Sequence, residues 1–386
     1  MSWVQSTLGE VADIFSGYAF KSADMNSEGG TPLIKIKNIA DSAVSHECDA
    51  FLNKDFNLAK FERFHLLRDD FLVAMTGQGS VGRIGKMRDY KPGFYVNQRV
   101  AIVRVNPEKA NPVFIFYQIA TRSNELELFK KANGAGQPNI SAKQIGELPV
   151  VLPSTEQQRY IADALSSYDD LIENNQKQIK LLEEAAQRQY KEWFVDLRFP
   201  GHETTSITDG IPEGWTEGTL VDLAVFKRGK TITKGQVNEG NVPVVAGGRA
   251  PAYYHDTPNT DAPVITVSGS GANAGFTQMY YTKVWASDCS YIDVSVTHDI
   301  AWIYCFLKEN KASIDSMQKG AAQPHVYAKD LNAMKVVVPC DSLMEQFRTA
   351  AEPMFSKIGK LEMQIKMLTE ARDRLLSKLM NGEIEV

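Results

Sequence analysis

The sequence Gln-Ile-Lys-Leu-Leu-Glu-Glu-Ala at residues 178–185 returns as Gln-Ile-Lys-Met-Leu-Thr-Glu-Ala at residues 364–371. Six of the eight positions are identical, at an offset of 186 residues. A recurrence at a fixed offset indicates an internal repeat, and a repeat has to be recognised before the fold is assigned.

The repeat extends outward in both directions. Trp, Thr, Leu, Ala and Gly occur at residues 3, 7, 8, 12 and 17, and again at residues 215, 219, 220, 224 and 229. Gln137-Pro138 matches Gln323-Pro324 at the offset of 186. The chain is therefore a tandem duplication with a shorter second copy.

Each copy ends in an apolar pattern that steps alternately by four and three residues, from residue 161 to 193 and from 347 to 379. This spacing predicts the seam of a coiled coil. Ser154 is the expected N-cap of the first helix, which Phe199-Pro200-Gly201 would end. Pro339 precedes the second helix, and Asn381-Gly382 would end it.

We expect the two long helices to pack on each other. The alternative is that each helix packs separately on its own globular part. Asn175, Gln189 and Arg372 interrupt the seam, and buried polar seam residues usually fix register and partner. The residues predicted to pair the helices are Ile172, Ile179, Leu182, Ile358, Ile365 and Leu368.

The segments ahead of each helix carry short apolar runs separated by Gly, Asn and Pro, which is typical of a mixed sheet with loops. The predicted fold class is α+β: two tandem mixed-sheet domains, each followed by a long helix, with the helices pairing antiparallel. The predicted boundaries are 1–152 and 206–338 for the sheet domains, 153–205 for the first helix and a polar linker, and 339–386 for the second helix.

Composition excludes several classes of protein. The 386 residues include 42 Lys and Arg against 47 Asp and Glu, a formal net charge of −5. No apolar stretch approaches the ~20 residues of a membrane span, and the first residues do not resemble a secretory leader. The four cysteines form no Cys-x-x-Cys pair, which argues against zinc ribbons and disulfide scaffolds. We expect a reduced, cytoplasmic setting.

Three motif matches fail on context. Ala224–Thr231 fits a relaxed Walker A pattern, but the run before it is expected to be helical, whereas a P-loop follows a strand and opens a helix. Gly77–Gly82 fits a dinucleotide fingerprint, but a strand is expected after it. Asn111–Phe114 resembles the base-holding motif of amino-methyltransferases without its second proline, and Pro112 is the expected start of a helix.

The Gly-rich loop at 77–82 has a counterpart at 269–275. Such loops either bring backbone close to a ligand or make a tight hairpin, and the sequence leaves both open. The histidines show no metal-ligand spacing, and no nucleophile, base and orienter come together. We therefore expect no catalytic residues and no metal.

The order of motifs resembles the specificity subunit of type I restriction–modification enzymes over essentially the full chain. The motifs are Trp215-(x)3-Thr219-Leu220 (more loosely at Trp3), Gly136–Ile140 and Ala322–Val326, Leu148–Pro153 with Glu156-Gln157, Met334–Pro339 with Glu345-Gln346, and Trp193–Asp196 with Phe199-Pro200. Each is weak alone, but in this order and twice over they are specific.

The resemblance implies a non-catalytic subunit with two target recognition domains, each reading half of a bipartite double-stranded DNA target. The paired helices would set the distance between half-sites and carry two methyltransferase subunits and the restriction subunits. S-adenosylmethionine, ATP and Mg would bind those partners and not this chain. The alternatives are a free-standing adenine methyltransferase and a structural coiled-coil adaptor.

Candidate DNA contacts are polar, loop-borne residues near the Gly-rich turns, since Arg pairs with guanine and Asn or Gln with adenine in the major groove. For any one of them, a solvated surface side chain or a turn-capping amide is the alternative interpretation. The candidates are Lys21, Lys35, Lys37, Gln78, Ser80, Arg83, Asn97, Gln98 and Arg99 in the first copy, and Lys230, Lys234, Arg249, Tyr253, Tyr254, Ser270, Asn273 and Lys283 in the second.

Overall fold

The computed structural model describes residues 3–134, 136–319, 324–380 and 383–384. Ala322 and Gln323 of the second end-of-domain motif, and the Asn381-Gly382 helix stop, lie outside these residues. The chain forms two compact units. The first comprises residues 1–171 and 368–386, and the second comprises residues 172–367.

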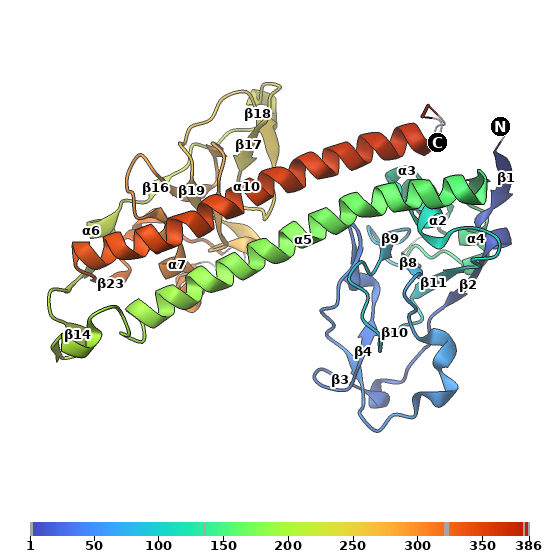
Figure 1. Cartoon of the computed structure of the whole chain (residues 1–386), viewed down its shortest axis with the longest axis horizontal. Coiled ribbons are helices and arrows are strands. Elements are labelled where there is room, and N and C mark those ends of the chain that lie inside the picture. Colours follow the sequence, from blue (N-terminus) through green and yellow to red (C-terminus); the bar gives the residue numbers. More distant parts are fainter. Residues whose placement is uncertain (1–2, 135, 320–323, 381–382, 385–386) are drawn as a thin grey trace. The chain divides into compact units, whose positions relative to one another are not determined.

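The first unit contains a mixed six-stranded sheet, a four-stranded sheet and a two-stranded sheet (Figure 1). The six-stranded sheet has the order β2 (Ala12–Ser16), β11 (Val100–Val105), β8 (Phe71–Ala74), β9 (Ile84–Lys86), β6 (Ser42–Val44), β5 (Ile39–Ala40). The others are β10 (Tyr95–Val96), β4 (Thr31–Ile34), β7 (Phe51–Leu52), β3 (Met25–Asn26), and β1 (Val4–Thr7) with β12 (Pro149–Leu152). The helices are α1 (Leu8–Val11), α2 (Pro112–Ile119), α3 (Arg122–Lys131) and α4 (Ala142–Gly146), with 3-10 turns η1 (Ser22–Asp24), η2 (Ile36–Asn38), η3 (Leu58–Lys60) and η4 (Glu62–Phe64).

The second unit repeats the central part of this arrangement. Its four-stranded sheet has the order β16 (Lys227–Arg228), β22 (Cys289–Asp293), β19 (Val264–Ser268), β20 (Thr277–Tyr280). The other sheets are β18 (Tyr253–His255), β17 (Val242–Val245), β21 (Trp285–Ala286); β15 (Thr216–Thr219) with β23 (Lys335–Val338); and β13 (Ile207–Thr208) with β14 (Ile211–Pro212). The helices are α6 (Leu220–Leu223), α7 (Ile300–Glu309), α8 (Lys311–Ser316) and α9 (Ala328–Asn332), with η5 (His202–Thr204), η6 (Lys234–Gln236) and η7 (Gly271–Asn273).

Strand pairing confirms the duplication. The order β2-β11-β8-β9 corresponds to β16-β22-β19-β20, and the parallel pair β10–β4 corresponds to the parallel pair β21–β17. The antiparallel pair β1–β12 corresponds to β15–β23. Strands β5 and β6 extend the sheet of the first copy alone among the described residues, which agrees with its greater length. The predicted α+β class is confirmed.

The long helices are α5 (Thr155–Phe194) and α10 (Asp341–Met380), each of 40 residues. Ser154 caps α5 as predicted, because its hydroxyl accepts from the Gln157 amide at 3.3 Å while the Gln157 side chain accepts from the Ser154 amide at 3.2 Å. The predicted end at Phe199-Pro200-Gly201 is five residues late. Leu197 takes a left-handed conformation, φ 56°, and closes the helix before the proline is reached.

The two helices run antiparallel within each unit. In the second unit the Asn175 amide donates to Gln364 at 3.4 Å, and the Tyr190 and Phe347 rings lie 6.1 Å apart. In the first unit Leu379 of α10 belongs to the same buried cluster as Ile161 and Leu165 of α5. A later residue of one helix thus meets an earlier residue of the other.

Part of each seam faces a sheet domain instead of the other helix. In the first unit Phe114 and Ile115 of α2 share one core with the sheet and with the start of α5 (Figure 1). In the second unit α7 takes the same place, and Ala186 and Tyr190 of α5 are buried with it. Both interpretations of the helices therefore hold in part, because each helix packs on its partner helix and on a sheet domain.

The six predicted pairing residues differ in burial. Ile172 and Ile358 are buried, Ile179 and Leu182 pack against the core of the second unit, and Ile365 and Leu368 are half-buried. One seam position was misplaced. Tyr168 was expected inside, but the adjacent Asp169 is the buried residue, at 8% exposure. Periodicity favours the tyrosine, and only partners distant in sequence make burial of the carboxylate possible.

Candidate nucleic-acid interface

Three loops of the first copy are joined by backbone hydrogen bonds into what we call the first loop cluster: residues 17–21, 75–83 and 97–99. The Met75 amide donates to the Arg99 carbonyl at 2.9 Å, and the Gln98 amide donates to the Tyr18 carbonyl at 3.0 Å. A Cβ added at Gly17 would lie 2.3 Å from the Val96 carbonyl oxygen, so glycine is required for this close approach. The candidates Gln98 and Arg99 thus lie beside the Gly-rich turn.

The second copy builds the same cluster from residues 229–234, 269–276 and 286–288. The Gly269 amide donates to the Asp288 carbonyl at 3.1 Å, as Met75 does to Arg99. The Gly229 amide donates to Cys289 at 2.8 Å, as Gly17 does to Val100. A Cβ added at Gly229 would again lie 2.3 Å from a carbonyl oxygen, that of Ser287.

Equivalent backbone positions carry different side chains in the two clusters. Tyr18 occupies the place of Lys230, since their amides donate to Val96 and Ala286 at 2.9 Å in both cases. Arg99 occupies the place of Asp288. A conserved backbone therefore presents an arginine in one copy and a carboxylate in the other.

The Gln-Pro motif braces the Gly-rich turn in both copies. The Gly77 amide donates to the Pro138 carbonyl at 3.1 Å, and the Gly271 amide donates to the Pro324 carbonyl at 3.0 Å. Ser141 caps α4 directly after this brace, as predicted. The turns close the β8–β9 and β19–β20 hairpins, so the hairpin interpretation is correct, and contact with a ligand remains a separate question.

Several first-copy candidates are engaged locally. The Ser80 hydroxyl donates to the Thr76 carbonyl at 2.9 Å, and Arg83 donates to the Gly79 carbonyl at 2.7 Å. Lys35 and Lys37 both pair with Asp49, at 3.6 and 2.6 Å. The hydrogen bond from Lys37 lowers the pKa of the Asp49 carboxyl, so this carboxylate offsets part of the positive charge.

The remaining first-copy candidates point to solvent. Lys21, Gln78, Gln98 and Arg99 are exposed. The Asn97 side chain accepts from the Arg99 amide at 3.3 Å and shapes the turn. Exposed side chains on a braced loop have the mobility and reach that base or phosphate contacts require.

Second-copy candidates divide into groups. Arg249 donates to Asn273 at 3.3 Å and lies over the Phe276 ring, and the Ser270 hydroxyl donates to Asp288, so these residues gather at the Gly-rich turn. The Lys230 ammonium lies 5.8 Å from the centre of the Trp285 ring.

The other second-copy candidates lie apart from that turn or have an acidic partner. Lys234 is exposed, whereas Lys283 pairs with Asp261 at 2.6 Å. Tyr253 and Tyr254 lie on β18, in a different sheet from the turn, and are 36% and 53% exposed.

Sequence reasoning missed Tyr18 and Asp288. The offset of 212 residues pairs Tyr18 with Lys230 and was a usable signal. Asp288 had none, because the offset between copies changes from 212 to 186 inside the globular part. Only strand register shows that Asp288 corresponds to Arg99.

The motif contexts agree with the sequence analysis. Lys227–Arg228 is strand β16, and the Lys230-Thr231 pair is followed by a three-residue 3-10 turn, not by the helix a P-loop needs. Asn111 caps α2 through its side chain, so the Asn-Pro pair starts a helix. In the described part of the chain, no three His, Cys, Asp or Glu side chains are placed to share a metal ion. Of the helices described, none is long and apolar enough to cross a membrane.

Two copies of one loop-bearing sheet, each followed by a long helix, define a duplicated recognition scaffold. Residues 1–184 and 212–348 match the family described as Type I restriction modification DNA specificity domain. The chain therefore belongs to the family of type I restriction–modification specificity subunits. Its sheet domains are DNA-recognition domains, and it is a specificity subunit and not a catalytic one.

Individual relatives agree. The MjaIX specificity subunit of Methanocaldococcus jannaschii is 26% identical over 300 residues, which is 71% of this chain and 69% of that protein. The HindI specificity subunit of Haemophilus influenzae is 22% identical over an alignment covering 99% of each chain. The crystal structure of a type I S subunit from M. genitalium covers 98% of this chain and 96% of its own, with a TM-score of 0.62 and 19% identity, which shows a common fold.

Proposed function

We propose that this chain recognises a bipartite, asymmetric DNA target, with residues 1–152 reading one half-site and residues 206–338 reading the other. The observation that carries the proposal is the pair of loop clusters, which share their backbone hydrogen bonds and differ in their side chains. Arg99 in one cluster and Asp288 in the other favour different base edges, because arginine donates to guanine and a carboxylate accepts from cytosine. Two half-sites of different sequence follow.

The helices support a rigid separation between half-sites. DNA presents the same groove face every ~34–36 Å, so two readers have to be held at a fixed distance. Each helix is 40 residues long, about 60 Å at 1.5 Å per residue. Both helices pass from one unit into the other, and a paired helix resists bending better than a single chain.

We further propose that the helices carry two methyltransferase subunits and, in the full complex, the restriction subunits. Apolar side chains remain exposed on both helices, and exposed apolar surface marks protein contacts. They are Leu171, Leu181, Met363 and Met367, from 51% to 64% exposed. S-adenosylmethionine, ATP and Mg would bind the partner subunits, and the complex would act on DNA in the cytoplasm.

A segment exchange tests the division of reading between the copies. Residues 206–338 are replaced by the matching segment of a relative with a different target, and methylated adenines are mapped across the genome of a host that carries the complete complex. We expect a hybrid motif with one half-site retained and one new. The reciprocal exchange of residues 1–152 is the matched control and should change the other half only. If both halves changed in either exchange, the proposal of separate readers would be wrong.

A further inference from the structure

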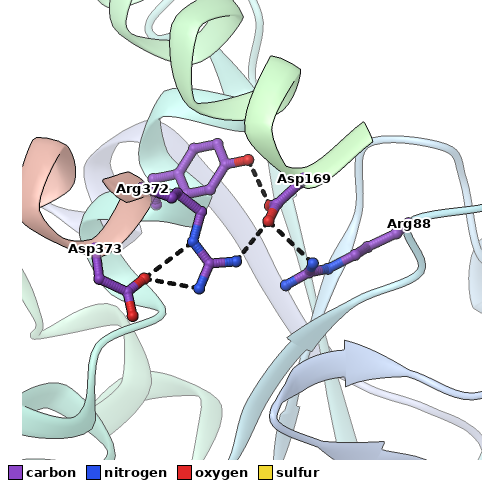
Figure 2. Close-up of polar contacts among 5 residues, drawn as sticks. Arg88, Asp169, Arg372 and Asp373 are labelled. Carbon is purple, nitrogen blue, oxygen red and sulfur yellow. Dashed lines mark hydrogen bonds and ion pairs between the residues drawn. The ribbon is translucent and has the colours of Figure 1, made fainter. Parts of the chain in front are cut away.

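A buried charged cluster joins the first sheet domain to both long helices. Asp169 of α5 accepts from Arg88 at 3.0 Å and from Arg372 of α10 at 2.5 Å through one carboxylate oxygen (Figure 2). Its other oxygen accepts from the Tyr117 hydroxyl at 2.7 Å. Arg88 follows β9 and Tyr117 lies on α2, so one carboxylate links four elements of the first unit. We call these four residues the Asp169 cluster.

The charges in this cluster are held firmly. Burial lowers the pKa of the Arg372 guanidinium, but its hydrogen bonds to Asp169 and to the neighbouring Asp373 outweigh burial and raise it. Burial, together with the nearby Asp169 carboxylate, raises the pKa of the Tyr117 hydroxyl. All four residues therefore keep one protonation state across the physiological range.

The cluster is a costly way to obtain stability. The Arg88 Nε atom is buried with no hydrogen-bond partner among the described residues. Replacing a buried ionic group by apolar residues of similar volume is often neutral or stabilising. A partly satisfied polar network therefore calls for an explanation other than stability.

The second copy provides the comparison. At the offset of 186 residues, Asp169 corresponds to Phe355, and Arg372 corresponds to Ala186. Both are buried in the core of the second unit, where the Phe355 ring meets the Tyr304 ring edge-on at 5.8 Å. The same helix pairing is thus built with apolar residues in one copy and with an ion pair in the other.

The ion pair distinguishes one helix register from its neighbours, whereas an apolar pair does not. If α10 slid by one turn along α5, the residue opposite Asp169 would be Leu368 or Leu376, four positions on either side of Arg372. The buried carboxylate would then lose the Arg372 partner, and burying a charge without its partner is strongly unfavourable. An apolar pair tolerates such a slip, because leucine and phenylalanine are interchangeable in an apolar seam to a first approximation.

We propose that the Asp169 cluster fixes the register of α10 on the first unit, and that it thereby sets the tolerance of the complex for the gap between half-sites. The second clause rests on the proposed bipartite function. One helical turn moves α10 by ~6 Å, four residues at about 1.5 Å each, which is nearly two base pairs at ~3.4 Å each. Asp169 and Arg372 are positioning residues, since their effect on DNA is indirect.

The experiment compares the wild-type chain with two variants in the complete methyltransferase complex. The apolar variant combines Asp169→Leu, Arg372→Met, Arg88→Met and Tyr117→Phe, so that no buried polar group is left alone. The second variant, Asp169→Asn, keeps the shape and removes the charge. A Glu173→Ala variant, which removes a surface ion pair of α5 with Lys177, is the control.

Methylation is measured on targets whose gap is one or two base pairs shorter or longer than the natural gap. For the apolar variant, we expect discrimination between the natural gap and a gap two base pairs away to fall by about tenfold or more, at an unchanged urea midpoint. We also expect faster amide exchange in residues 368–380, a measurement that needs no DNA. Asp169→Asn should shift both readouts in the same direction, and the control should match the wild type.

The two possible failures are distinguishable. If the wild type shows no gap preference at all, the bipartite function is at fault, and amide exchange alone then decides the register proposal. If the wild type discriminates sharply and both variants discriminate equally well, with unchanged exchange, the cluster does not fix the register and the inference is wrong. If the apolar variant fails to fold, Asp169→Asn decides the question in the same way.

Discussion

Four residues inserted into both long helices should lengthen the preferred gap in the DNA target. The structure specifies the positions: after Leu171 in α5 and after Met367 in α10, where each helix passes from one unit into the other. An insertion farther along α5, next to Ala186, would instead disrupt the buried core of the second unit. Four residues complete about one helical turn, so seam residues stay close to their original face.

The expected change in gap follows from helix geometry. Four residues add ~6 Å, and DNA rises ~3.4 Å per base pair, so translation alone predicts a gap longer by nearly two base pairs. Rotation adds a second constraint, because four residues turn a helix about 40° beyond a full turn, while one base pair turns DNA by about 35°. We therefore expect the preferred gap to grow by one or two base pairs.

The assay is methylation of a target series with gaps from the natural length to three base pairs longer. Two matched variants isolate the cause. Four residues inserted after Asp209, in the exposed turn between β13 and β14, should leave the gap unchanged. Four residues inserted into α5 alone should displace Asp169 from Arg372 by about one turn and abolish activity. A double insertion that assembles, methylates and keeps the natural gap would refute the view that the helices set the distance.

Three further predictions concern single residues. Arg99→Ala should weaken recognition of the first half-site by about 1–3 kcal/mol, whereas Arg83→Ala, whose side chain braces its own loop, should have little effect, as measured by binding to targets mutated in one half-site. Gly17→Ala should destabilise the chain by about 1–3 kcal/mol in urea unfolding, because the new Cβ would lie 2.3 Å from a carbonyl oxygen, whereas Gly136→Ala, with no atom within 4 Å of the added Cβ, should not. Burial and the nearby Glu183 raise the pKa of Glu362 from 4.5 to about 7, so its contribution to stability is present below pH 4.5 and is lost as pH rises to about 7. Since solvent still reaches this side chain, we expect Glu362→Gln to remove a loss of only about 1 kcal/mol between pH 5 and 8, and an identical pH dependence in both proteins would contradict this assignment.

Local signals in the sequence were sufficient for the architecture. The two offsets predict the duplication, the four-three periodicity predicts both long helices, and Ser154, Ser141 and Asn111 cap the helices that they were expected to begin. These features depend on residues a few positions apart, where the backbone leaves few alternatives. The end of α5 was misplaced because Leu197 adopts a left-handed conformation, which is uncommon for leucine and has no sequence signature.

Features that depend on distant residues were not predictable. Asp169 accepts from Arg88, Tyr117 and Arg372, which lie 81, 52 and 203 positions away. A carboxylate one position off a heptad seam looks like a solvated surface residue until those partners are placed around it. The correspondence of Arg99 and Asp288 was hidden for a similar reason, since the loops between them differ in length and only strand pairing aligns them.

A duplicated chain has to solve a problem that a single copy does not have. Two similar seams can pair in more than one register, and identical apolar pairs at symmetric positions would stabilise several of these nearly equally. The chain keeps the apolar solution in one copy, with Phe355 and Ala186 buried, and replaces it by Asp169 and Arg372 in the other. Stability can then come from the apolar copy and register from the charged one. The loop clusters follow the same principle, because a shared backbone fixes the position of each reading surface while Arg99 and Asp288 make the two surfaces different. Divergence after duplication therefore lies where identity would leave either the pairing or the target undefined.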